Sequence, residues 1–94
     1  MSAPDRIARM RARLEAGLAP ERLEITDDSA RHVGHAGARD GRGHYSVAIV
    51  SAAFEGRSAV ARHRMVYDAL GDMMQTDIHA LQIRAMTPAE ASSR

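Results

Sequence analysis

The stretch that decides the fold is RHRMVYDALGDMMQTDIHALQIRAMTP, residues 62–88. In its first half, apolar residues recur at the spacing of a buried helical face, and they are Val66, Ala69, Leu70, Met73 and Met74. Its second half, IHALQIRAM, alternates apolar with polar residues, which predicts a strand over residues 78–86. His79 stands where the helical pattern gives way to the strand pattern.

The rest of the chain predicts further helices and strands and one long loop. In order, the predicted elements are a helix over 5–16, a strand over 22–27, a loop over 29–43, a strand over 44–51, helices over 58–63 and 64–75, the strand over 78–86 and a last turn from Pro88. Asp5 favours the first helical turn, and Gly17 is expected to end that helix. Ser58 and Thr87 are expected to cap later helices.

This order of elements is that of an α+β fold, with a three-stranded sheet and the helices on one face. The chain has 94 residues, so we expect one domain over residues 1–94. The loop over 29–43 contains four glycines and one large apolar residue, so we expect it to be flexible. The tail, residues 91–94, is expected to fray.

Composition excludes several classes of protein. The chain has no cysteine, so it forms no disulfide and offers no thiolate ligand. We find no signal peptide and no apolar run of membrane-spanning length, so we expect a soluble, cytoplasmic protein with no membrane partner. The net charge is +1, yet residues 29–64 hold six arginines against two acidic residues. This basic middle fits either nucleic-acid binding or a solvated surface.

The sequence contains no motif of an enzyme active site. It has no Ser-centred nucleophile motif and no paired-carboxylate pattern, and its Gly-rich loop lacks the Lys and the Ser or Thr of a phosphate-binding loop. We therefore expect a binding protein and not an enzyme.

Two segments carry a resemblance to a known family. FEGRSAVARHRMVYDAL, residues 54–70, followed by IHALQIRAMTPAE, residues 78–90, resembles the C-terminal half of the BolA-like proteins. Upstream, LEITDDSARH, the Gly-rich loop and HYSVAIVS are similar as well, so the resemblance covers about residues 5–90. It implies a fold similar to a type II KH domain, in agreement with the order of elements above.

The resemblance implies two activities. One is a partnership with a monothiol glutaredoxin, in which a [2Fe–2S] cluster is shared between the two chains and glutathione and serves iron–sulfur trafficking or iron regulation. The other is DNA binding in transcriptional regulation, which in this family includes stress responses. Neither activity fixes the oligomeric state, and a weak homodimer stays open.

For the cluster, the resemblance implies two ligands from this chain. One is the His of IHAL, which is His79, and the match to SARH points to His32 as the other. Many relatives carry Cys in that loop, whereas this chain offers only imidazoles. A chain without Cys is expected to bind no cluster alone, because such clusters are normally held by thiolates. Imidazole binds metal in its neutral form, so acid should weaken the complex.

The residues themselves leave other histidines open. His79 shares strand parity with Leu81 and Ile83, so we expect its side chain to start from the core-facing side, at the rim of the core. The sequence holds four more histidines: His32, His35, His44 and His63.

These four histidines have different settings. His32 and His35 lie in the Gly-rich loop, and by spacing alone either could be the second ligand. His44 begins the second strand and is expected near His79 if those strands are neighbours. His63 is interpreted as a structural link between the two predicted helices.

The nucleic-acid alternative rests on arginines near the F-x-G turn. Arg57, Arg62 and Arg64 are candidates to contact phosphates. Against this reading, the chain lacks the G-x-x-G loop with which a KH domain clamps a nucleic-acid backbone. Surface aromatic residues for base stacking are also expected to be missing.

Overall fold

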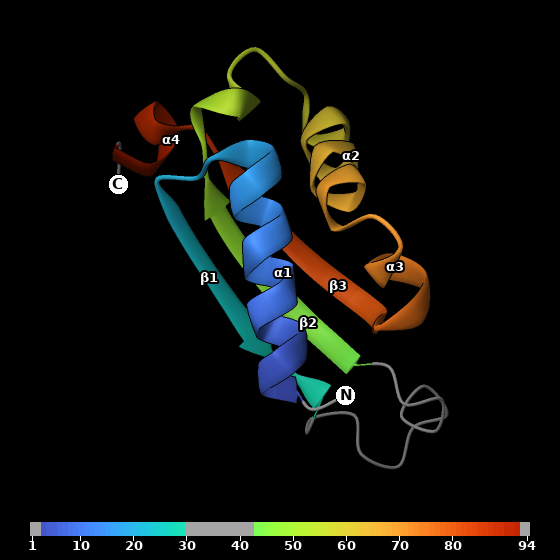
Figure 1. Cartoon of the computed structure of the whole chain (residues 1–94). Helices are drawn as coiled ribbons and strands as arrows, with labels where there is room; N and C mark the ends of the chain where they lie inside the picture. The colour runs from blue at the N-terminus through green and yellow to red at the C-terminus, as the bar shows by residue number, and fades with distance from the viewer. Residues whose placement is uncertain (1–2, 30–42, 93–94) are drawn as a thin grey trace.

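The computed structural model describes residues 3–29 and 43–92 (Figure 1). Along the chain the elements are α1 (Ala3–Leu18), β1 (Arg22–Asp27), β2 (Gly43–Val50), the 3-10 turn η3 (Ala52–Phe54), α2 (Ala59–Leu70), α3 (Met73–Thr76), β3 (Ile78–Met86) and α4 (Pro88–Ser92). The predicted order of elements is confirmed. Most of the predicted flexible loop over 29–43 lies outside the described residues, so its flexibility stays a prediction.

Within the described residues, the three strands form one sheet in the order β1-β2-β3. β1 and β2 pair antiparallel, as a hairpin requires, and β2 and β3 pair parallel through the crossover that contains α2. Figure 1 shows α1 and α2 on the same side of this sheet. The predicted α+β architecture, with helices on one face, is confirmed.

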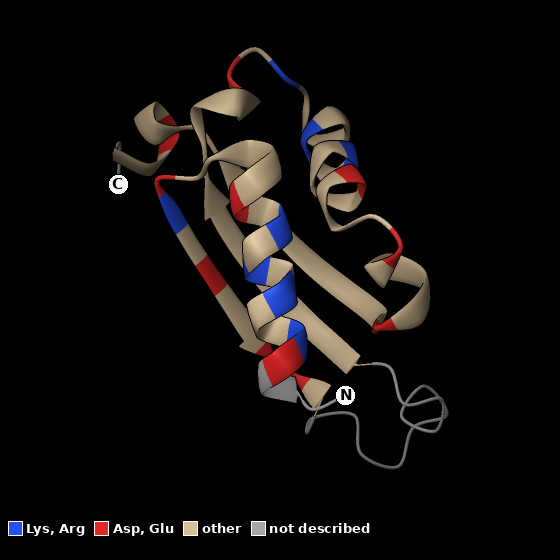
Figure 2. Cartoon of the chain, in the orientation of Figure 1, with Lys and Arg blue, Asp and Glu red and all other residues tan. Residues whose placement is uncertain are grey.

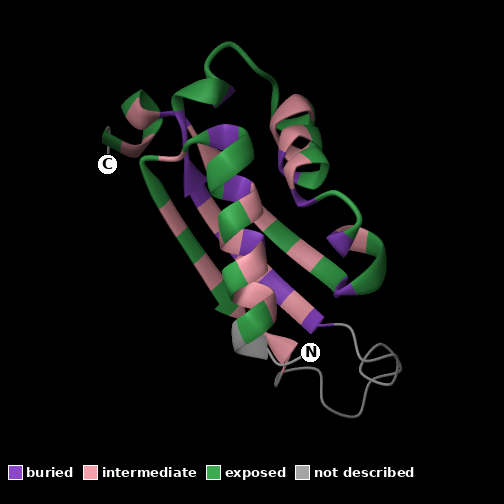
Figure 3. Cartoon of the chain, viewed as in Figure 1, coloured by how far each residue is buried: buried purple, intermediate pink, exposed green. Residues whose placement is uncertain are grey.

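The core lies between the sheet and these two helices. β2 is the central strand, and every second side chain of it is buried toward the helices: Tyr45, Val47 and Ile49. Opposite them, α1 and α2 contribute fully buried side chains, namely Met10, Leu14, Val66 and Leu70. Figure 3 shows buried residues along β2 and at intervals along α1. The alternation along β2 therefore leaves its other side chains on the sheet face opposite α1 and α2.

The sequence predicted that Gly17 ends the first helix, and this prediction is wrong. α1 continues to Leu18, and Ala19 leaves the helix with φ of 45°. A Cβ atom at Gly17 would lie 3.1 Å from the Cβ of Ala69 on α2. The glycine therefore permits the close approach of α1 and α2, which is a tertiary role that the cap prediction missed.

The break between the later helices is at Gly71 and not at His63. α2 is one helix, begun by Ser58, whose Oγ accepts a hydrogen bond from Ala61 N–H at 3.1 Å. Gly71 caps its end with φ of 60°, a conformation that favours glycine. Arg13 of α1 donates to the Leu70 carbonyl at this end, so a distant helix helps to stop α2. The predicted boundaries 58–63 and 64–75 are therefore wrong.

The C-terminal turn is held by reciprocal hydrogen bonds. Thr87 Oγ1 accepts from Glu90 N–H at 3.1 Å, and Thr87 N–H donates to Glu90 Oε1 at 2.9 Å. This is a capping box, and it confirms the predicted cap at Thr87. The strand predicted over 78–86 matches β3 in both bounds.

Candidate functional site

The start of β3 contains a bulge. Gly43 pairs with Ile78 and His44 pairs with Ala80, so His79 is an extra residue on β3. Ile78 is 1% exposed and lies in the core, whereas His79 is exposed. The prediction that His79 starts from the core-facing side is therefore wrong. The extra residue shifts the alternation, and Ile78 takes the core position that strict parity had given to His79.

The bulge brings His79 to His44. The ring centroids of these two imidazoles are 5.1 Å apart, and their planes are tilted by 51°. His44 is half-buried and lies next to Tyr45 on β2, so it points to the sheet face opposite α1 and α2. The prediction that His44 lies close to His79 if their strands are neighbours is confirmed.

The end of β1 fixes the backbone of His44. His44 N–H donates to Ser29 Oγ at 3.0 Å, and Asp28 N–H donates to the His44 carbonyl at 2.7 Å. Ser29 N–H in turn donates to Asp27 Oδ1 at 2.8 Å, and Ser46 Oγ donates to an Asp28 carboxylate oxygen. Both polar groups of the His44 backbone are therefore satisfied, which sets the position of its side chain.

Asp77, which directly precedes β3, is hydrogen-bonded to β2 through its backbone carbonyl. Gly43 N–H donates to the Asp77 carbonyl at 2.9 Å. A Cβ atom at Gly43 would lie 2.6 Å from the ring of Tyr45, so the ring packs directly over this glycine. His44 directly follows Gly43, and His79 lies two positions after Asp77. Packing and hydrogen bonds fix the positions of Gly43 and Asp77.

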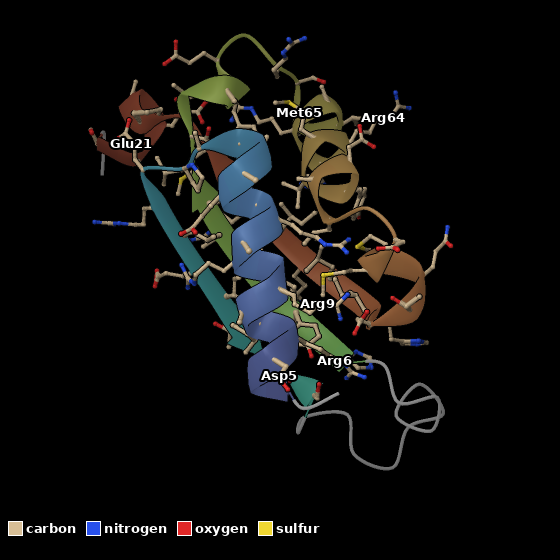
Figure 4. The ribbon with its side chains drawn as sticks, viewed as in Figure 1. Asp5, Arg6, Arg9, Glu21, Arg64 and Met65 are labelled. Atoms are coloured by element: carbon tan, nitrogen blue, oxygen red, sulfur yellow. The ribbon has the colours of Figure 1, made fainter. Side chains whose placement is uncertain are left out.

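The Asp77 side chain links this junction to α1. Its carboxylate is buried and accepts a hydrogen bond from Thr76 Oγ1 at 2.6 Å. Arg6 Nε and an Arg9 nitrogen lie 3.3 and 3.4 Å from it, and Figure 4 shows both arginines near the starts of β2 and β3. The Thr76 hydrogen bond lowers the pKa of Asp77, and the charges of Arg9 and Arg6 lower it further, against the opposing effect of burial. The carboxylate is therefore held ionised under the start of β3.

The structure brings together two of the candidate ligands. His44 and His79 form the pair, whereas His32 and His35 lie outside the described residues. His63 lies inside α2, so it does not stand at a break between two helices as predicted. Across residues 3–29 and 43–92, no group of three or more His, Cys, Asp or Glu side chains is arranged to hold a metal ion. The pair therefore places two imidazole rings side by side on this part of the chain.

The candidate phosphate-binding arginines fall into two groups. Arg57 and Arg64 are exposed, and Figure 4 shows Arg64 extending from the outer side of α2. Arg62 instead binds Glu90 through two nitrogens, at 2.7 and 3.1 Å, and also donates to the carbonyls of Arg57 and Ala85. The donors of Arg62 are therefore committed within the fold.

The same outer face of α2 carries a residue that the sequence analysis missed. Tyr67 is 39% exposed, so the expectation that surface aromatic residues are missing is wrong. Tyr67 is three residues after Arg64, so on a helix the two side chains lie on the same face. This spacing was the available sign that Tyr67 is exposed. Figure 2 shows both basic and acidic residues along α2.

The fold and this site define a small two-layer α+β domain with paired imidazoles at one end of its sheet. The family model described as BolA-like protein matches residues 14–90, so the chain belongs to the BolA-like family, as the resemblance predicted. Within the described residues, no helix is long and apolar enough to cross a membrane.

Curated relatives agree with this family. "SufE-like protein 1, chloroplastic/mitochondrial" of Arabidopsis thaliana is 48% identical over 87% of this chain, which covers 24% of that protein. "Protein BOLA1, chloroplastic" of the same plant is 44% identical over 96% of this chain, which covers 58% of that protein. The chain therefore spans only part of the length of both relatives.

A solved structure has the same fold. "BolA domain of SufE1 from Arabidopsis thaliana" superposes with a TM-score of 0.82 at 46% identity, over 96% of this chain and 98% of that domain. The protein named "DNA-binding transcriptional regulator BolA" in Escherichia coli (strain K12) is 37% identical over 87% of this chain and 75% of its own length. The likeness to a type II KH domain stays a prediction.

Proposed function

We propose that this chain is the partner of a monothiol glutaredoxin, with which it shares a [2Fe–2S] cluster for iron–sulfur trafficking or iron regulation. The observation that carries the proposal is the His44–His79 pair, with ring centroids 5.1 Å apart. The function is therefore one of binding and transfer and not of catalysis. We place it in the cytoplasm, although the names of two relatives assign those proteins to chloroplasts or mitochondria.

The spacing of the pair fits two ligands on one metal ion. Imidazole nitrogens bind a tetrahedral ion at about 2.0–2.1 Å, which sets the two ring centroids about 5 Å apart. The pair needs no large movement of the strands to meet this requirement. Nε2 of His44 is buried, so this residue would bind through Nδ1 or after its ring has turned.

The donor set of the pair is incomplete in a way that calls for a partner. The chain has no cysteine, and its described part offers no third donor beside the two imidazoles. Thiolates from a glutaredoxin and its glutathione would supply the remaining ligands. Ligation by two histidines on one iron raises the potential of such a cluster.

The chain's own residues supply position and access. The bulge exposes His79 while β3 keeps its backbone in the sheet, and Ser29 and Asp28 hold the backbone of His44. His32 and His35 remain candidates for the second ligand in place of His44, because the resemblance points to the loop.

The test is a titration of the chain with a glutaredoxin that carries a glutathione-ligated cluster, followed by visible absorption and circular dichroism. His79→Ala should abolish the spectral change, and His63→Ala should leave it unchanged. Comparison of His44→Ala, His32→Ala and His35→Ala identifies the second ligand. An unchanged spectrum with His79→Ala would refute the proposal.

DNA binding is the second candidate function, and a specific surface favours it. Arg57, Arg64 and Tyr67 are exposed together on and before α2, a combination suited to phosphate contact and base stacking. A relative bears the name "DNA-binding transcriptional regulator BolA". Arg57→Gln with Arg64→Gln should then weaken DNA binding and reduce its salt dependence, while His79→Ala should not. Equal DNA affinity and salt slope in the double variant and the wild type would exclude this surface.

A further inference from the structure

We propose that the His44–His79 pair in the free chain also binds a single divalent transition-metal ion such as Cu²⁺, Ni²⁺ or Zn²⁺. The site would be mononuclear and would form without any glutaredoxin. It uses the same two side chains as the proposed cluster site, and only its regulatory consequence rests on that function.

The geometry is that of two donors on neighbouring strands. Parallel pairing of β2 and β3 fixes the two backbones, and the bulge turns His79 toward the ring of His44. The ring separation of 5.1 Å is close to the value of about 5 Å expected for two imidazoles on one tetrahedral ion. The sheet therefore places the two rings close together, and His44 would bind through Nδ1 or after its ring has turned, because its Nε2 is buried.

The chemistry of the donors selects the class of ion. Imidazole nitrogen suits Zn²⁺, Cu²⁺ and Ni²⁺, whereas Ca²⁺ and Mg²⁺ require several oxygen ligands. Among ions of this class, affinity for a nitrogen site is expected to be highest for Cu²⁺. The described residues add no third side-chain donor, so water would complete the coordination and the ion would be exchangeable.

An ion held by both imidazoles would withhold them from any other metal centre. If the proposed cluster function holds, a bound mononuclear ion would block the shared cluster, and the ion would act as a regulator of the partnership. This consequence follows from the identity of the ligands and requires no conformational change.

The primary experiment uses the full chain alone in a non-coordinating buffer. Cu²⁺ and Zn²⁺ are titrated into the wild type and into His44→Ala, His79→Ala and His63→Ala, with calorimetry for both ions and copper absorption for Cu²⁺. We expect one ion per wild-type chain and unchanged binding with His63→Ala. His44→Ala and His79→Ala should each weaken binding by at least about tenfold, which is the lower end of the loss that removal of an outer-sphere partner causes.

A competing location for the ion is the loop sequence His32-Val33-Gly34-His35. The double variant His32→Ala with His35→Ala tests it in the same titration. Binding that is lost in this double variant but retained in His44→Ala and His79→Ala would overturn the proposal. Absence of a one-to-one complex in the wild type would overturn it as well.

A measurement on the wild type guards against a variant that fails to fold. Substoichiometric Cu²⁺ broadens the proton signals nearest to it, so the ring signals of His44 and His79 should disappear before those of His63. Broadening that begins at other histidines would refute the site even if neither alanine variant can be purified.

A second arm separates this inference from the proposed function. Chain loaded with Zn²⁺ is mixed with cluster-bearing glutaredoxin, and the spectral change should be reduced relative to the metal-free chain. No spectral change with metal-free chain would refute the cluster function and leave the mononuclear site standing. An equal change with and without Zn²⁺ would refute the regulatory consequence.

Discussion

The substitution Gly43→Ala tests the packing that positions the histidine pair. The added Cβ atom would lie 2.6 Å from Cε2 and Oη of Tyr45 and 2.7 Å from Cζ. Carbon atoms in favourable contact are about 3.5–4.0 Å apart, so the overlap is severe. Tyr45 is 1% exposed, so the strand or the buried ring must shift. Overpacking of this kind costs about 1–3 kcal/mol.

The assay is urea unfolding followed by far-ultraviolet circular dichroism. In a domain of this size, each 1 kcal/mol lowers the melting temperature by about 4–8 °C, so thermal unfolding gives an independent check. The matched control is a double-mutant cycle with Tyr45→Leu, whose smaller side chain makes room for the methyl group. We expect Gly43→Ala to cost less in the Tyr45→Leu background, with a coupling of about 0.5–3 kcal/mol.

Two results would refute this reasoning. A neutral Gly43→Ala would mean that the ring does not pack over the glycine. An equal cost in both backgrounds would mean that the cost is conformational and not a clash with Tyr45. The substitution should also weaken Cu²⁺ binding by the free chain, because Gly43 precedes His44 and donates to the Asp77 carbonyl.

Three further predictions follow from single contacts. Hydrogen bonds from Arg62 and from Thr87 N–H lower the pKa of Glu90 from 4.5 to about 2, so its ionised form stabilises the fold above pH 4.5 and this stability is lost as the pH falls toward 2. Glu90→Gln should flatten the unfolding profile in that window, and an unchanged profile would contradict the assignment. Tyr45→Phe should be neutral or stabilising by about 1 kcal/mol in urea unfolding, because the buried hydroxyl has no hydrogen-bond partner in the part of the chain that the structure describes. A loss of stability of about 1 kcal/mol or more would reveal a missed partner of this hydroxyl. Gly71→Ala should cost about 1–3 kcal/mol in the same assay, because alanine is strained at φ of 60°, and a neutral result would mean that the cap can rearrange.

Local patterns predicted most of the fold correctly. The bounds of β1 and β3 were predicted because each strand alternates and is flanked by residues that break strands. The helix break at Gly71 was missed because the apolar spacing continues to Met73 and Met74, and because the glycine cap is only one of its two causes. Arg13, 57 positions away from Leu70, donates to the carbonyl at the end of α2. A helix end that depends on a distant side chain cannot be read from the periodicity of the helix itself.

The site was predicted only in part, for a related reason. The sequence identified His79 as a candidate ligand. It predicted that His44 lies near His79 only if their two strands are neighbours in the sheet. Whether they are neighbours depends on the crossover between β2 and β3, which the sequence pattern does not show. It could not predict the bulge, because the alternation of apolar and polar residues contains no signal that marks one residue as extra. The exposure of Tyr67 was missed because composition says how many aromatic residues exist and not which face they occupy.

The bulge connects the stability of the fold to its site. With strict alternation from Leu81 and Ile83, His79 would point into the core and Ile78 would face solvent. The extra residue exchanges these two environments, so the domain gains the burial of an isoleucine, about 1.5–3 kcal/mol, and avoids burying an imidazole. The force that exposes His79 beside His44 is therefore apolar burial at the preceding residue. An imidazole positioned in this way remains accessible as long as Ile78 stays packed in the core.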